Sequence, residues 1–313
     1  MFAIFGVTLP YFALIGCGYA ARWRGVMVEG SAKALNAFVL YFALPALMVR
    51  TIAAIPFEDV FNPGFFAAWG SVSVLMFVGT LIVSGLVMRQ GGAAATVHAA
   101  ATTHGNVGYL GITLVVSLAG EAAAAPVAMA IIFDMLFVVT LTIALLSRLS
   151  PGAGAEVPSL LATARSAILN PFVLAIGAGL LLSLSGAEIP KPVDDFMRIL
   201  GMAAVPAALF AIGVTLYGQP MRAAASELGW ICAAKLLIHP LVMIFVATTD
   251  VFGLTREEIV IAVLLASLPV ANNVFILALR YETRPNRMSG AILFSTGAAL
   301  ATFNLWAWLL LSG

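Results

Sequence analysis

The sequence predicts an all-α polytopic membrane protein whose ten spans form an inverted repeat of five plus five. Three observations lead to this prediction. The composition is typical of a membrane protein, ten apolar stretches are long enough to cross a bilayer, and the two halves share features at a constant spacing. The fourth and ninth stretches are interrupted by Gly, Pro and Asn, so both are predicted to be broken helices that cross each other.

The composition excludes an ordinary soluble protein. Hydrophobic residues make up 62% of the 313 residues, charged residues make up 9%, and the mean hydropathy is +1.08. Soluble domains average about 45–50% apolar and about 25% charged residues. A net charge of +1 without a basic tract gives no indication of a nucleic-acid partner, so the lipid bilayer is the expected surrounding.

Ten stretches meet the requirement of about 20 mostly apolar residues for a membrane-spanning helix. They are residues 2–21, 34–54, 64–88, 94–118, 125–147, 166–185, 197–217, 227–249, 257–280 and 288–311. The first has its basic residues after the apolar run, so it is expected to be a retained span rather than a signal peptide. Residues 151–165 are predicted as a cytoplasmic linker between a first repeat, residues 1–150, and a second repeat, residues 166–313.

Pairs of prolines indicate an internal duplication. Pro10 and Pro171 are 161 residues apart, and so are Pro45 and Pro206. Each pair falls in corresponding spans of the two halves. Because five is an odd number, the second copy enters the membrane from the opposite side, and the repeat is expected to be inverted.

Charges in the connections predict the orientation. Basic residues concentrate on the cytoplasmic side, and ten of them fall in odd-numbered connections against four in even-numbered ones. The protein is expected in the inner membrane of the cell, and both of its termini are expected on the outer, periplasmic side. The odd connections hold Arg22, Arg24, Lys33, Arg89, Arg148, Arg165, Arg222, Arg280, Arg284 and Arg287, and the even ones hold Arg50, Lys191, Arg198 and Arg256.

The interruption of the fourth span is the first candidate for a substrate site. It consists of Gly105, Asn106, Val107, Gly108 and Tyr109. Glycine permits unusual backbone angles and lets a ligand approach the main chain. A helix that restarts here presents free N–H groups and its positive dipole end, which suit an anion. The alternative is a close helix–helix contact in which the Asn amide bonds to a neighbour.

The interruption of the ninth span contains Pro269, Asn272 and Asn273. Proline removes one backbone donor and disturbs the preceding turn. Adjacent asparagines cannot both face one side of a helix, and two of them inside a span need polar partners. Under inverted symmetry this interruption is expected beside the first one near the middle of the bilayer, with the substrate at the crossing.

Ionisable residues inside spans are functional candidates. Asp134 is placed to carry a coupling proton, with a structural ion pair as the alternative. Lys235 and His239 share a helix face, so they are expected to balance an anionic substrate or Asp134. The alternative for Lys235 is that its side chain extends to the cytoplasmic interface. His104 is a candidate for proton coupling because it is close to Asn106, although a packing role is the alternative.

No sequence pattern of an enzyme active site, a phosphate-binding loop or a metal-ligand cluster is present. The chain is therefore not expected to be an enzyme, and no cofactor and no metal site are predicted. The coupling ion is expected to be H⁺ or Na⁺.

Three stretches resemble the auxin efflux carrier family, and more closely its bacterial malonate or malate permeases, over essentially the whole chain. They are Gly105–Ile112, Leu209–Leu216 and Leu268–Tyr281. The resemblance implies a fold similar to bile-acid symporters and sodium/proton antiporters. It also implies scaffold helices at residues 2–54 and 166–217, moving transport helices at residues 64–147 and 227–311, an elevator-type motion and a homodimer formed through the scaffold.

The plant carriers of this family have a proline in each crossover, and an asparagine of the first one binds the carboxylate. This chain has Gly108 in the first interruption and a second Asn in the other, which argues against indole acetate as its substrate. The predicted function is secondary active transport of a small organic anion, a mono- or dicarboxylate such as malonate or malate. The alternatives are a sodium/proton antiporter on the same fold and a membrane receptor that binds a ligand without translocating it.

Overall fold

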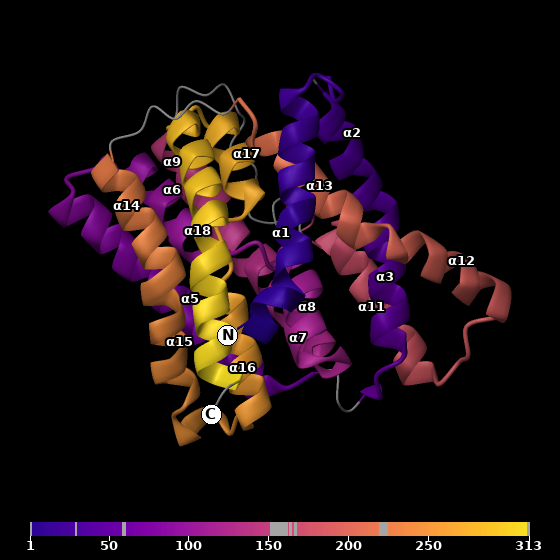
Figure 1. Ribbon diagram of the computed structural model, residues 1–313. Coiled ribbons are helices and arrows are strands. Elements are labelled where there is room, and N and C mark those ends of the chain that lie inside the picture. Colours follow the sequence, from indigo (N-terminus) through magenta and orange to yellow (C-terminus); the bar gives the residue numbers. More distant parts are fainter. Residues whose placement is uncertain are drawn as a thin grey trace.

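The computed structural model describes residues 2–28, 30–57, 61–150, 168–218 and 225–311, together with Ala162 and Arg165 (Figure 1). Every regular element in these residues is a helix, and their strand-like pairing is limited to one isolated antiparallel bridge between Gly105 and Val270. The all-α prediction is confirmed for the described residues. The predicted linker, residues 151–165, lies outside them except for Ala162 and Arg165, and so does Arg222.

Six helical segments in the described residues are long and apolar enough to cross a membrane. They are Ser31–Ala53, Pro63–Val87, Glu121–Leu149, Lys191–Leu216, Ala225–Ala247 and Pro285–Leu311. Two shorter apolar helices are Val107–Ala119 and Val173–Ser185. The chain is a multi-pass membrane protein, while the number of ten spans and the inverted repeat stay predictions.

A first helix group is formed by residues 2–53 and 171–216. It consists of α1 (Phe2–Trp23), α2 (Ser31–Phe38), η1 (Val39–Ala43), α3 (Leu44–Ala53), α11 (Pro171–Ser185), α12 (Lys191–Met202) and α13 (Ala204–Leu216). Helix α1 packs on α13, and α3 packs on α11 and α12 at the right of Figure 1. Helix α12 begins before the predicted start at residue 197, because Pro192 fits a first helical turn, where its missing N–H costs nothing.

A second helix group is formed by residues 63–149 and 225–311. It consists of α5 (Pro63–Ile82), η2 (Val83–Val87), α6 (Gly92–Thr103), η3 (Val107–Val115), α7 (Val116–Ala119), η4 (Glu121–Ala123), α8 (Ala124–Phe133), η5 (Asp134–Val139), α9 (Thr140–Leu149), α14 (Ala225–Ala233), η6 (Ala234–Ile238), α15 (His239–Ala247), η7 (Asp250–Phe252), α16 (Arg256–Ala266), α17 (Asn272–Arg280) and α18 (Pro285–Leu311). These two groups cover the ranges predicted as scaffold and transport helices, and the roles themselves stay predictions.

Side-chain caps explain where two helices of the second group, α5 and α16, begin. The Asn62 side chain accepts a hydrogen bond from the backbone N–H of Phe65 and so caps α5. Thr255 and Glu258 form a reciprocal capping box at the start of α16. Both caps satisfy backbone donors that would otherwise lack a partner at the end of an apolar helix.

Two π-helical segments end two residues before a proline. Segment η1 precedes Pro45 of α3, and η6 precedes Pro240 of α15. Proline has no N–H to donate, and its ring crowds the preceding turn. A widened turn accommodates the ring, and it also changes which side chains share one face of the helix.

Close contacts between helices of the first group recur at the proline spacing. A Cβ atom added to Gly18 of α1 would lie 2.0 Å from the Phe210 carbonyl oxygen of α13. A Cβ atom added to Gly179 of α11 would lie 3.1 Å from the Val49 carbonyl oxygen of α3. Gly179 follows Gly18 by 161 residues, and Phe210 follows Val49 by 161 residues. Small residues at both places let the backbones approach closely.

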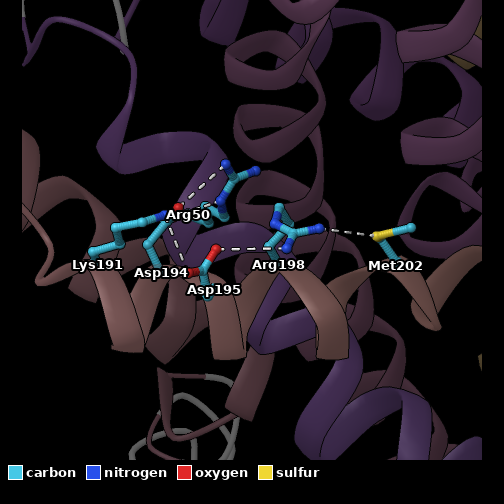
Figure 2. A network of polar contacts seen from close by, with 6 residues as sticks. All are labelled: Arg50, Lys191, Asp194, Asp195, Arg198 and Met202. Carbon is cyan, nitrogen blue, oxygen red and sulfur yellow. Dashed lines mark hydrogen bonds and ion pairs between the residues drawn. The ribbon is translucent and has the colours of Figure 1, made fainter.

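A chain of charged side chains ties α3 to α12 at the periphery (Figure 2). The Arg50 Nε donates to Asp194 Oδ1 at 2.6 Å, and Asp195 contacts both Lys191 and Arg198 along α12. These side chains are at least one-third exposed, and exposed ion pairs contribute little to stability. The network therefore gives the first helix group a polar end, and it contributes little to the stability of that group.

Candidate substrate site at the crossing of two interrupted helices

The first interruption lies between α6 and η3. His104 leaves the helix with extended backbone angles (φ −81°, ψ 102°), and the chain becomes helical again at Val107. Gly105 has no side chain, and a Cβ atom there would lie 3.0 Å from the Lys235 ammonium nitrogen. A glycine at this position therefore lets a buried cation approach the interruption closely.

The second interruption lies between α16 and α17. Helix α16 ends at Ala266, and α17 begins at Asn272. Pro269 falls between the two helices and cannot donate a backbone hydrogen bond. Both interrupted spans expected from the sequence are therefore interrupted in the structure.

The two interruptions pair through their main chains. The backbone N–H of Asn106 donates to the Pro269 carbonyl at 2.9 Å, and the N–H of Ala271 donates to the His104 carbonyl at 3.1 Å. These bonds form the antiparallel bridge between Gly105 and Val270. Backbone that leaves a helix at membrane depth needs partners within the protein, and each interruption supplies them to the other.

A cavity of about 530 Å³ adjoins the crossing and lies between the two helix groups. It is lined by seven of the eight residues predicted to bind substrate, namely Gly105, Asn106, Val107, Gly108, Tyr109, Asn272 and Asn273. Pro269 does not line it and contributes its carbonyl to the bridge instead. The first helix group contributes the facing wall, which includes Lys33, Asn36 and Tyr41, and Asn170, directly before α11, adds to it.

Two helix N-termini begin at this cavity. Both Val107, the first residue of η3, and Asn272, the first residue of α17, line it. First-turn N–H groups have no partner within their own helix and carry the positive end of the helix dipole. The amides of Asn106, Asn272 and Asn273 in the interruptions add further donors and acceptors without a net charge. This combination of groups suits a carboxylate.

Asp134 lies at the wall of the cavity, and the Trp69 and His104 side chains contact its two carboxylate oxygens. The Trp69 indole N–H donates to Asp134 Oδ1 at 3.0 Å, and His104 Nδ1 lies 3.0 Å from Asp134 Oδ2. On the other side of the imidazole, His104 Nε2 lies 3.2 Å from the Asn273 side-chain nitrogen. Only 1% of Asp134 and 4% of His104 is exposed. A buried chain of polar contacts thus runs from Trp69 to the amide-bearing end of α17.

Lys235 and His239 lie behind the crossing and do not line the cavity. The Lys235 Nζ lies 2.8 Å from both His239 Nδ1 and the Ala266 carbonyl oxygen. Lys235 is completely buried, so the alternative in which its side chain extends to the membrane interface is wrong. The reason is that two polar partners, the His239 imidazole and the carbonyl at the end of α16, are within reach inside the helix group.

Several polar residues at the site were not singled out from the sequence. Trp69 lies in a largely apolar stretch 65 residues before Asp134, so no local pattern indicated a bond between the two side chains. Lys33 was considered only as a loop charge, although it lines the cavity. In the part of the chain that the structure describes, no three His, Cys, Asp or Glu side chains are grouped as a metal site requires.

Comparisons with known proteins match this sequence to transporters. The family described as "Membrane transport protein" matches residues 3–307. A protein of Rhizobium meliloti (strain 1021) named "Putative malonate transporter" is 34% identical over 318 residues, which cover 100% of this chain and 98% of that protein. The "Uncharacterized transporter YfdV" of Escherichia coli (strain K12) is 27% identical over 306 residues, or 96% of each chain.

The similarity extends to plant proteins over part of the chain. The "Probable auxin efflux carrier component 1b" of Oryza sativa subsp. japonica is 30% identical over 142 residues, which cover 44% of this chain and 25% of that protein. The family and these relatives are transporters and not enzymes. The chain belongs to the membrane transport protein family, which includes the auxin efflux carriers.

Proposed function

We propose that this membrane transporter carries a small organic anion, a mono- or dicarboxylate such as malonate or malate, by secondary active transport. The substrate binds at the crossing of the two interrupted helices, and the second helix group moves against the first in an elevator-type motion. The observation that carries the proposal is that two helix N-termini and the three asparagines of the two interruptions border one cavity between the two groups.

The charge distribution at the cavity supports an anion over a cation. Helix N-termini attract negative charge, and Lys33 adds a basic side chain to the wall. Asp134 is a carboxylate at the wall, but donors already engage both of its oxygens. A sodium/proton antiporter would need an acidic pair at the crossing, whereas Asp134 is the single acidic residue among the described cavity-lining residues.

The packing and the charge bias support ten spans in an inverted arrangement. The glycine contacts of α1 with α13 and of α11 with α3 are related by the same 161-residue shift as the prolines. Lys33, in the first connection, and Asn170, soon after the fifth, both line the cavity, and both connections are odd-numbered. With those connections in the cytoplasm, the cavity opens inward. In this proposal the protein lies in the inner membrane with both termini outside the cytoplasm. It forms a homodimer through the first helix group.

Uptake by proteoliposomes tests the substrate and the site. Purified protein is reconstituted, and uptake of labelled malonate, malate and other small carboxylates is measured with and without sodium. We expect saturable uptake of a carboxylate, and loss of that uptake in the double variant Asn106→Ala, Asn273→Ala, because both amides border the cavity. The matched control is Asn286→Ala, an exposed amide outside the cavity, which should transport normally. Normal saturable transport by the double variant would contradict the site.

A further inference from the structure

We propose that His104 is the proton-binding site of this carrier, and that its protonation turns the Asn273 amide from an acceptor into a donor for the substrate carboxylate. The inference rests on the proposed function and deepens it, because it names the coupling ion and the group that links the ion to the substrate. It is carried by the continuous contacts from Trp69 through Asp134 and His104 to Asn273.

The positions of the hydrogens follow from which atoms are able to donate. The Trp69 indole is only a donor, so Asp134 Oδ1 accepts from it. His104 Nδ1 faces the other oxygen of the same ionised carboxylate at 3.0 Å, and therefore Nδ1 carries a hydrogen. In the neutral imidazole, Nε2 then has no hydrogen and accepts from the Asn273 Nδ2 group 3.2 Å away.

This arrangement leaves the Asn273 carbonyl oxygen, an acceptor, for other partners. A carboxylate is itself an acceptor and gains nothing from that oxygen. A second proton on His104 makes Nε2 a donor as well. The Asn273 amide satisfies that donor by turning over, so that its oxygen faces the imidazole and its NH₂ group becomes available at the cavity. Asn273 lines the cavity, so the turned amide offers a donor to the substrate.

The fixed charges around His104 favour the same coupling. The charged and titratable groups that face it are Asp134 of η5, Lys235 of η6, whose Nζ lies beside Gly105, and His239 of α15, which contacts Lys235. As a carboxylate and an ammonium, Asp134 and Lys235 carry opposite charges. With both histidines neutral, this buried cluster has no net charge.

A proton alone would leave one uncompensated positive charge in the cluster, and a carboxylate alone would leave a negative one. Uncompensated buried charge is costly, so the proton and the carboxylate each promote binding of the other. The coupling step forms one bond, the N–H bond at His104 Nε2, and breaks it again on release. His104 Nε2 takes a proton from the solution on the side where the substrate enters and gives it up on the side where the substrate leaves.

Proton uptake during substrate binding tests the inference directly. Malonate is titrated calorimetrically into the purified protein near neutral pH, in buffers with different ionisation enthalpies. We expect the wild-type protein to take up a proton with each malonate. His104→Gln should bind malonate without proton uptake, and its affinity should no longer depend on pH. The control His98→Gln removes another buried histidine of α6 that does not line the cavity, and it should take up protons like the wild type.

A second variant separates the amide mechanism from simple attraction by the imidazolium. Asn273→Ala keeps His104 and removes the amide, so we expect weaker malonate binding with no proton uptake. If it still takes up a proton with each malonate, the amide role is wrong, and this variant decides the matter even if His104→Gln does not fold. If the wild type binds malonate without proton uptake, the inference about His104 is overturned and the proposed function is not. Binding of no small carboxylate at all would instead overturn the proposed function.

Discussion

His98 of α6 and His104 directly after α6 each pair with a buried carboxylate, but the partners that complete the two pairs differ. His98 Nε2 lies 2.7 Å from Glu227 Oε1, and Arg284 and Arg287 contact the same carboxylate. His104 Nδ1 lies 3.0 Å from Asp134, whose other oxygen accepts from the neutral Trp69 indole. We call Glu227 with its His98, Arg284 and Arg287 partners the Glu227 cluster. Asp134 with His104 and Trp69 is the Asp134 cluster.

The difference in partners indicates a difference in role. Two guanidinium groups already compensate Glu227, and the Glu227 cluster joins α6, α14 and the start of α18 away from the cavity. Asp134 and His104 border the cavity, and the imidazole ends on an amide that is able to turn. The Glu227 cluster is therefore suited to hold helices together, and the Asp134 cluster is suited to respond to what enters the cavity.

The largest effect on stability is expected from Glu227→Gln. Removing one partner of a buried ion pair costs about 3–5 kcal/mol, and we expect about 3 kcal/mol here because the two arginines are 28% and 34% exposed and so regain water. The thermal midpoint in detergent should fall clearly, while the malonate affinity of the folded protein stays unchanged. Glu121→Gln, at an exposed carboxylate, is the control. An unchanged thermal midpoint for Glu227→Gln would contradict a structural role for this cluster.

Asp134→Asn should affect transport more than stability. The amide oxygen still accepts from Trp69, so we expect a loss of about 1–2 kcal/mol, as for one poorly satisfied buried group. Without the carboxylate, His104 has no fixed tautomer and the buried charges no longer balance. Accumulation of malonate against its gradient should stop, while exchange of labelled for unlabelled malonate continues in proteoliposomes. Undiminished pH-driven accumulation would show that Asp134 has no part in coupling.

Gly105→Ala should have a moderate effect confined to the crossing. The new methyl group would lie 3.0 Å from the Lys235 Nζ, which the Ala266 carbonyl and His239 hold in place. We expect a loss of about 1 kcal/mol, at the low end for overpacking, measured as a lower thermal midpoint. Gly108→Ala is the matched control for stability, because its methyl group would meet no atom within 4 Å. Equal midpoints for the two variants would contradict the close approach of Lys235.

The smallest effect is expected from Ser84→Ala. The Ser84 hydroxyl lies 3.2 Å from Nδ1 of His98, which belongs to the Glu227 cluster. Losing one buried hydrogen bond costs about 1 kcal/mol, and neither the malonate affinity nor its dependence on pH should change. Titration of this variant with malonate at several pH values is the check. A changed pH dependence would mean that the two clusters are coupled through α6.

The positions of the interruptions could be predicted from the sequence because their causes are local. Gly105 and Pro269 change what the backbone can do at their own positions. Asn106 and Asn273 are amides in apolar runs, and their burial requires polar partners nearby. These features are visible without knowledge of the fold, and seven of the eight predicted binding residues border one cavity.

The partners of the buried charges could not be predicted in the same way. Trp69 reaches Asp134 from another helix, and no spacing in the sequence encodes that contact. The direction of the Lys235 side chain depends on how deep α14, η6 and α15 lie and how they are rotated, which packing decides. A widened turn at η6 adds a further change of register that hydropathy does not reveal.

The backbone bridge between Gly105 and Val270 has a consequence for the direction of flux. Since two main-chain hydrogen bonds join the half-helices, the pocket is expected to travel as one intact body and to present an identical set of ligands toward either compartment. The ligands that the two interruptions supply would then give no preference for influx or efflux. The gradients of anion and proton across the bilayer alone would then decide which way the carrier runs.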